Sequence, residues 1–335
     1  MGHLRQWRRL LISAAVLVVL LVLPGVLTRD LVTALFFAFT FVTLALNYDL
    51  LGGFLGYLNL GQGTFFGLGA YATFILATKI PAAAAGFGPL SLAGLAALAV
   101  AITAVFAFAV AYPLFRLRGA YFAIATLGLF LLIRQLILNL ERLTGGSFGI
   151  YLPPGYYVGQ RLAYTLILGL AVVSLAINDS ISRTRLGIAF HAIRESERAA
   201  AAIGIDLFRY KQIAFVISAI PSALAGCLFG LHFGYVDQES VLGVDKTLFP
   251  VIMAMLGGTG MVWGPVVGLA LIRAIDVGLK NYLTLPVPAL AVYGVILMML
   301  GLFRPEGILA GLARRRTGTG QSMPAEPTLR RGEHG

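Results

Sequence analysis

Charged side chains are scarce in this sequence. Only 12% of its 335 residues are charged, whereas 59% are hydrophobic. A soluble domain has about 25% charged residues, so this chain has too few polar side chains to cover its apolar surface in water. The composition excludes an ordinary soluble domain and predicts a membrane protein, whose function we expect at the polar exceptions to the apolar rule.

Cysteine is nearly absent as well, because Cys227 is the single one. One cysteine excludes an internal disulfide, and the four histidines are scattered without metal-ligand spacing. The sequence also lacks a G-x-x-x-x-G-K-[ST] loop and any soluble stretch long enough for an ATPase domain. We therefore expect no catalytic residue, no metal and no cofactor in this chain, and any ATP must be bound by another protein.

What the sequence does contain is a series of long apolar runs, and a spanning helix needs about 20 such residues. We favour ten spans within a range of eight to ten, because 247–279 fits either one broken element or two helices. The first run resembles a signal peptide, but it is long enough to span and no A-x-A site follows it. The sequence thus predicts an all-α polytopic membrane protein, with candidate spans at 10–28, 31–50, 58–78, 90–112, 119–138, 162–178, 212–231, 247–257, 262–279 and 287–303.

The net charge of +11 comes largely from basic residues at the ends of these runs. That placement favours membrane topology over nucleic-acid binding, because positive loops stay in the cytoplasm. With the N-terminus inside, the clusters at Arg116–Arg118, 183–211 and Arg314–Arg316 all fall on the cytoplasmic side. We predict a basic N-terminus at 1–9, a membrane domain at 10–310 with an external loop at 139–161 and a cytoplasmic loop at 180–211, and a disordered cytoplasmic tail at 311–335.

Glycine is concentrated in LGGFLGYLNLGQGTFFGLGAY, residues 51–71, which hold seven glycines. One interpretation is close packing of helices. The other is a broken helix, whose unwound backbone presents polar groups to a solute in a cavity. Under the second interpretation the first candidates for a substrate path are Asn59, Gly61, Gln62 and Gly63. Tyr121 and Thr126 come next, because both bring a hydroxyl into an apolar span.

Two carboxylates lie near the ends of predicted spans. Asp49 and Asp179 fall where the topology places the cytoplasmic surface. A charge at the centre of the membrane costs about 3 kcal/mol or more. We therefore expect both carboxylates in water, and no proton relay.

The loop after the sixth predicted span is unusually polar. Apolar residues recur at helical spacing from Ile188, and His191, Arg194, Glu195 and Arg198 form a polar stripe. The pattern predicts one amphipathic helix that ends at Gly204, with Asp206 capping the next helix. Two roles are open: a helix lying on lipid headgroups, or a docking helix whose alanines 199–202 admit a partner.

Several blocks in this order resemble the branched-chain amino acid permeases of ABC importers, the LivM-like subunit in particular. The RAAAAIG stretch at 198–204 is similar to the EAA loop of ABC-importer permeases. The resemblance covers roughly residues 30–310. The other similar blocks are NYDLLGGFLGYLNLGQGTFFGLGAY (47–71), LRGAYFAIATLG (117–128), LTGGSFGI (143–150), RYKQIAFVISA (209–219), GGTGMVWGPVVG (257–268) and LFRPEGI (302–308).

The resemblance implies a permease subunit of the bacterial inner membrane that works by alternating access. It also implies a second, related permease, two cytoplasmic ATPase subunits and an external solute-binding protein as partners. The 188–204 helix would couple to the ATPase, with Ala199, Ala200 and Gly204 at matched motif positions and Arg194 and Glu195 beside them. Arg198 stands where the motif has glutamate, and Glu197 is the candidate replacement.

Three alternatives remain open at the level of sequence. A similar permease could carry urea or another small polar solute instead of an amino acid. An ATP-independent secondary transporter or channel would need no coupling helix, and a scaffolding membrane subunit would need no glycine-broken segment.

Overall fold

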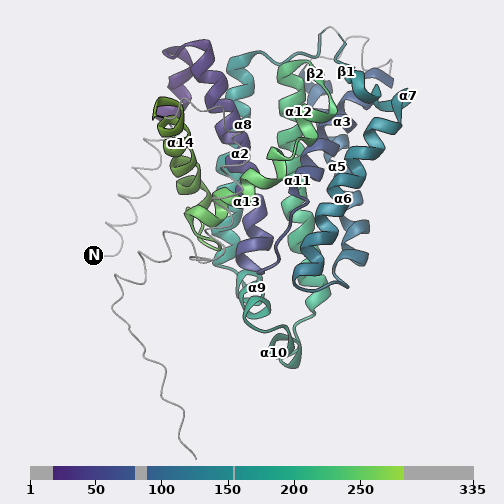
Figure 1. The fold of residues 1–335 in the computed structure, drawn as a ribbon, viewed down its shortest axis with the longest axis vertical. Helices are drawn as coiled ribbons and strands as arrows, with labels where there is room; N and C mark the ends of the chain where they lie inside the picture. The colour runs from purple at the N-terminus through teal and green to yellow at the C-terminus, as the bar shows by residue number, and fades with distance from the viewer. Residues whose placement is uncertain (1–17, 80–88, 154, 283–335) are drawn as a thin grey trace, which may run out of the picture.

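The computed structural model describes residues 18–79, 89–153 and 155–282. These residues form a bundle of α-helices with one antiparallel pair of two-residue strands, β1 (Ile150–Tyr151) and β2 (Tyr235–Val236). Most long helices stand upright in Figure 1, with β1 and β2 at the upper end and α9 and α10 at the lower end. We call these the strand end and the loop end. The helical, apolar character of the prediction is confirmed.

Within the described part of the chain, six helical segments have the length and hydropathy of a membrane span. Helices α3 (Gln62–Lys79) and α14 (Gly264–Tyr282) follow the expected runs 58–78 and 262–279 but are not among the six. Most of 10–28 and all of 287–303 lie outside the described residues, so the count of ten stays a prediction. The six are α2 (Arg29–Asp49) with the π-helical turn η2 (Leu50–Phe54), Leu92–Leu114 of α5 (Pro89–Leu114), α6 (Ala120–Asn139), α8 (Gln160–Ser182), α11 (Leu207–Phe233), and α12 (Gln238–Leu242) with α13 (Asp245–Gly257).

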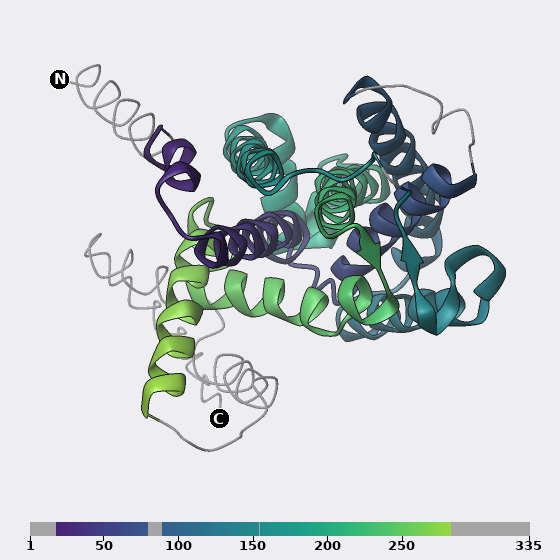
Figure 2. The same cartoon turned by 90° about the horizontal axis from the view of Figure 1, so that it is seen from above.

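Helix α11 forms the centre of the bundle and packs against α2, α3, α5 and α8. In the view from above, these helices surround it (Figure 2). Helices α5 and α6 instead keep large apolar side chains exposed, such as Val105 and Ile124. An apolar surface of this kind suits contact with lipid, because lipid tails do not penalise exposed hydrocarbon.

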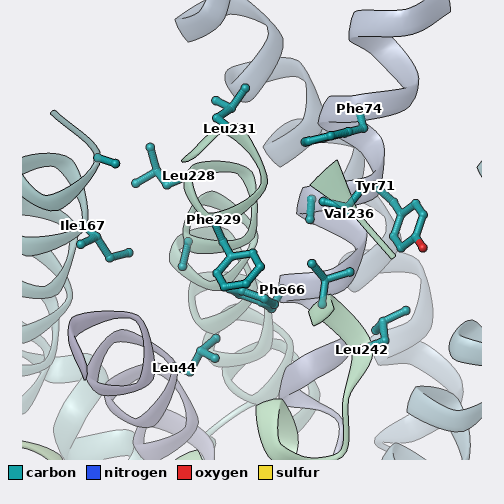
Figure 3. Packing of buried hydrophobic residues seen from close by; sticks show 14 of the residues in the cluster. Leu44, Phe66, Tyr71, Phe74, Ile167, Leu228, Phe229, Leu231, Val236 and Leu242 are labelled. Atoms are coloured by element: carbon teal, nitrogen blue, oxygen red, sulfur yellow. The ribbon is translucent and has the colours of Figure 1, made fainter. Parts of the chain in front are cut away.

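The largest core cluster joins α2, α3, α8, α11 and α12 (Figure 3). Phe66 of α3 meets Phe229 of α11 edge-to-face, with ring centroids 5.5 Å apart. Leu44 and Leu242 contribute to the same cluster from α2 and α12. Edge-to-face aromatic pairs stabilise by about 0.5–1.5 kcal/mol beyond the area that they bury.

Two spans are interrupted inside the bundle. The first is α2, which passes through η2 into a non-helical segment before α3 begins at Gln62. The predicted helix break within residues 51–71 is therefore confirmed, whereas a role of its unwound backbone in binding a solute stays a prediction. The second interruption lies at Gly243, whose extended backbone separates α12 from α13.

The polar loop is not one helix, so the prediction of a single helix over 188–204 was wrong. It forms α9 (Arg185–Glu195) and α10 (Glu197–Ala202). Ser196 separates them because its backbone is extended, and its hydroxyl caps α10 by accepting from the Ala199 amide. The expected ends are confirmed: Gly204 has a positive φ of 87°, and Asp206 caps α11 by accepting from the Arg209 amide. A local side-chain cap here outweighs the helical periodicity.

The remaining short elements complete the strand end. Three of them lie within the predicted loop 139–161, between α6 and α8. These are α7 (Glu141–Thr144), the 3-10 turn η3 (Gly146–Phe148) and strand β1, while the 3-10 turn η1 (Leu23–Gly25) precedes α2.

Candidate functional site

The unwound segment 55–61 is braced by a buried network of amides and hydroxyls. Asn59 Nδ2 donates to Gln62 Oε1 at 3.0 Å, and Asn59 Oδ1 accepts from the Gly61 amide at 2.9 Å. Gln62 Nε2 donates to Ser222 Oγ at 2.6 Å and to the Ser218 carbonyl at 3.2 Å, both on α11. These side chains are fully buried. The network therefore anchors the start of α3 near the middle of α11.

Two threonines form hydrogen bonds with backbone groups of the same segment. The Leu60 amide donates to Thr126 Oγ1 of α6 at 3.1 Å, and its carbonyl accepts from Thr247 Oγ1 of α13 at 2.7 Å. Gly61 is required here because a Cβ atom would lie 2.7 Å from the Thr126 carbonyl. Irregular backbone at membrane depth persists only where such partners replace the lost helical hydrogen bonds.

The structure thus brings together Asn59, Gly61, Gln62, Gly63 and Thr126. Gly63 joins through its amide, which donates to Thr247 Oγ1 at 3.4 Å. Tyr121 lies apart from them, 74% exposed near the start of α6. The polar side chains of this group are 0% exposed and hold the unwound segment in this conformation, and their place on a substrate path stays a prediction.

The polar loop contacts η2 at one point and the unwound segment at another. Arg194 of α9 donates to the carbonyl of Gly53 in η2. Glu197 of α10 accepts a hydrogen bond from the hydroxyl of Tyr57. The two contacts join the loop to the end of η2 and to the chain that follows it.

Glu197 is also the centre of an ionic cluster. Lys211 Nζ of α11 lies 2.6 Å from one of its carboxylate oxygens and 4.6 Å from the centroid of the Tyr57 ring. Arg118 Nε lies 3.7 Å from the other oxygen. Burial raises the pKa of Glu197, but hydrogen bonds from Lys211 and Tyr57 outweigh it and leave the pKa below its ordinary value. The carboxylate is therefore charged at neutral pH and engaged within this chain.

A hollow of about 380 Å³ opens between these elements. Tyr57 and Leu58 line it from the unwound segment, Arg118 from the turn before α6, and Arg194 and Glu197 from the loop. The hollow contains both signs of charge and lies at the loop end. Residues of all three elements face one another across it, so a movement of the loop would reach the unwound segment directly.

Helix α10 presents small side chains outward. Ala199, Ala201 and Ala202 are exposed, and Ile203 is 74% exposed. Ala200 points the other way, only 1% exposed, and packs in the core beneath the loop. Of the predicted coupling residues, Arg194, Glu195, Arg198, Ala199 and Gly204 are exposed, Glu197 is partly buried and Ala200 is buried.

The expectation of a solvated Asp49 was wrong. Its side chain is fully buried, and its carboxylate accepts from the Gly260 amide at 2.9 Å and 3.2 Å. The loop before α14 approaches closely because Gly53 has no side chain: a Cβ there would lie 2.3 Å from the Gly260 nitrogen. Asp179 is solvated as expected and pairs with Arg183 at 2.8 Å.

The sequence interpretation missed one pair of charges. Asp245 and Lys246 begin α13 immediately after the interruption at Gly243, and they form an ion pair. The signal was present, because the two charges lie between Gly243 and an apolar run. The expected span was instead started at 247, which left both charges outside it.

The chain is similar to a family of known transport proteins. Residues 31–301 match the family model described as the branched-chain amino acid transport system permease component. The chain is 29% identical to the high-affinity branched-chain amino acid transport system permease protein LivM of Escherichia coli, over 89% of this chain and 74% of that protein. It is 24% identical to the permease protein BraD of Pseudomonas aeruginosa, over 84% of this chain and 95% of that protein.

A second type of relative also matches. The chain is 24% identical to the permease protein LivH of Escherichia coli, over 81% of this chain and 91% of that protein. No solved structure matches the chain.

Proposed function

Because the chain belongs to the family of branched-chain amino acid transport permeases, we propose that it moves branched-chain or related small amino acids across the membrane by alternating access. It is a multi-pass membrane protein and a permease subunit. In our proposal the membrane is the bacterial inner membrane, the chain has ten spans, and both termini lie in the cytoplasm. The loop end is then the cytoplasmic end.

The proposed assembly contains four kinds of subunit. This chain pairs with a second permease, which the matches to both LivM and LivH support. Two ATPase subunits bind at the loop end, and a solute-binding protein delivers the solute at the strand end. ATP binds to the ATPases, so this chain needs no cofactor and performs no covalent chemistry of its own.

The observation that carries the proposal is the contact between loop and unwound segment. Arg194 binds the Gly53 carbonyl of η2 and Glu197 binds Tyr57 of the unwound segment, so the loop holds this part of the chain at two places. When the ATPases close, they displace the loop, and these contacts transmit the displacement to the unwound segment. The segment moves more easily than an intact helix, because its backbone hydrogen bonds are made to side chains of α6 and α13.

The docking surface is the exposed face of α10. Small side chains at Ala201 and Ala202 allow close approach, and Ile203 supplies an apolar contact. Glu197 faces Lys211 and Tyr57 within this chain. We therefore assign it to the internal contact and not to the ATPase.

The test is purification of the affinity-tagged chain from its native membranes. We expect wild type to copurify with a second permease and an ATPase, and Ala201→Glu plus Ile203→Glu to lose the ATPase while keeping the second permease. The matched control is Phe148→Glu, an exposed apolar residue at the strand end. It should retain both partners.

Two results would change the proposal. Absence of an ATPase from the wild-type preparation would remove the coupling role and leave an ATP-independent transporter as the explanation. If the ATPase is present but proteoliposomes import urea and not leucine, the assembly is correct and the solute is wrong.

A further inference from the structure

An ion pair lies at the centre of the membrane domain. Lys246 is 7% exposed, and its Nζ lies 2.5 Å from Asp245 Oδ2. The same Nζ lies 5.5 Å from the centroid of the Phe41 ring. Phe41 is near the middle of the 26-residue span Arg29–Phe54, so the pair is at mid-membrane depth. Ionisable side chains at this depth are costly and usually serve a binding or transport role.

Phe41 also lines a largely apolar cavity of about 330 Å³ that opens to the surface. The cavity lies between α2, α13 and α14. Its walls include Phe37, Phe249, Met253 and Leu269, and the exposed Arg273 also lines it. The Phe41 and Phe249 rings lie 5.5 Å apart. Phe41 therefore lies beside both features, so the ion pair and the largely apolar cavity adjoin near the interruption between α12 and α13.

We propose that Asp245 and Lys246 bind the headgroup of a zwitterionic amino acid whose branched apolar side chain enters this cavity. The inference rests on the proposed function and specifies where the solute is recognised on its path. Lys246 takes the carboxylate, and Asp245 takes the ammonium. Both lie in the first turn of α13, where the positive end of the helix dipole favours a solute carboxylate.

The charges explain why the solute should be zwitterionic. Without a bound solute, the two side chains neutralise each other. A bound zwitterion replaces their ion pair with two others, one between Lys246 and the solute carboxylate and one between Asp245 and the solute ammonium, and the net charge stays zero. A solute with a single charge would leave one side chain unpaired at mid-membrane depth, where an uncompensated charge is strongly unfavourable. The site should thus reject the deaminated acid and the decarboxylated amine that have the same side chain.

The proposal has a charged half, recognition of the headgroup by Asp245 and Lys246, and an apolar half, recognition of the side chain by the cavity. Amino-acid binding to the whole transporter in nanodiscs, without the solute-binding protein, tests the charged half. The probe is radiolabelled L-leucine, with 4-methylpentanoate and 3-methylbutylamine as competitors. We expect saturable leucine binding to wild type and competition at least tenfold weaker from either competitor than from unlabelled leucine. Asp245→Asn plus Lys246→Met should weaken leucine binding at least tenfold.

The matched control removes another ion pair of this chain. Arg134 and Glu239 pair at 2.6 Å between α6 and α12. Arg134→Gln plus Glu239→Gln should bind leucine like wild type, and subunit composition should match in all preparations.

A second variant tests the apolar half. Ala34 lines the cavity, so Ala34→Trp should fill it. Leucine binding should then fall at least tenfold, whereas binding of glycine, which has no side chain to place, should change less than twofold. Ala101→Trp on the exposed face of α5 is the control and should affect neither. Loss of the second permease from Ala34→Trp would instead identify the cavity as a subunit interface and overturn this half.

The competition on wild type decides the charged half even if the variant fails to assemble. Absence of leucine binding, or equal competition from the two charged analogues, would overturn it. So would wild-type binding by the double variant. Failure of the proposed function is a separate result: proteoliposomes with binding protein and ATP would then import no leucine.

Discussion

Glu197 connects three parts of the molecule through one carboxylate. It is 22% exposed, whereas its partner Lys211 is 4% exposed. The buried charge of Lys211 therefore depends on Glu197 for compensation more than Glu197 depends on Lys211. If Lys211 is removed, Glu197 still has water and Arg118. If Glu197 is removed, Lys211 keeps a buried charge whose remaining hydrogen-bond partner, among the described residues, is Tyr57.

This asymmetry gives a prediction for a double-mutant cycle. Loss of one partner of a buried pair leaves an uncompensated charge, so Glu197→Gln should destabilise the purified transporter by about 3 kcal/mol. Lys211→Met should destabilise it by about 1 kcal/mol, because the carboxylate that remains is partly hydrated. The double variant should be more stable than Glu197→Gln alone. Thermal unfolding of all four proteins measures the cycle, and additive effects would contradict the pairing.

The same pair predicts a dependence on pH. A carboxyl group whose pKa is lowered by folding stabilises the protein above its unfolded pKa, and that stabilisation is lost as the pH falls through the folded pKa. The pKa of Glu197 is lowered from 4.5, with hydrogen bonds from Lys211 and Tyr57 outweighing burial. The stability difference between wild type and Glu197→Gln should thus be full at neutral pH and shrink below pH 4.5.

At the scale of elements, the contact between α3 and α11 depends on glycine. A Cβ at Gly226 would lie 1.9 Å from the Phe66 carbonyl, and one at Gly69 would lie 2.1 Å from the Ala223 carbonyl. Neither distance is possible between a Cβ atom and an oxygen that are not bonded to each other. The two backbones can therefore approach this closely only because glycine has no side chain. Small residues permit this kind of approach between membrane helices.

Gly226→Ala should therefore separate α3 from α11 and destabilise the protein by about 1–3 kcal/mol, the usual range for overpacking. The control is Gly169→Ala in α8, where a Cβ meets no atom within 4 Å. That change should be neutral or stabilise by up to about 1 kcal/mol, because alanine favours a helix more than glycine does. Melting temperatures in detergent compare them, and equal effects would contradict the close contact.

At the scale of the whole molecule, the orientation in the membrane is testable with cysteine labelling. The native Cys227 is fully buried, so it should not react. In intact cells or spheroplasts, a membrane-impermeant maleimide should label Phe148→Cys at the strand end from outside. Ala201→Cys at the loop end should react only after the membrane is permeabilised. Labelling in the reverse order would invert the proposed orientation.

The sequence by itself determined the class of molecule and several of the positions where helices break or end. Scarce charge and long apolar runs predict membrane helices because hydrocarbon excludes unpaired polar groups. The glycines of 51–71 predicted the first interruption, and Gly204 and Asp206 predicted the ends around the loop. These features are local, so a short stretch of sequence is enough to specify them.

Only the tertiary structure decided which polar groups meet. Asp49 is buried because the Gly260 amide, far away in sequence, reaches its carboxylate. Glu197 is drawn inward by Lys211 and Tyr57, and Ala200 packs beneath the loop instead of facing a partner. Asp245 and Lys246 reach mid-membrane depth because the second interruption restarts the helix beside Phe41. Such contacts depend on how distant segments pack against one another, and helical periodicity carries no information about that.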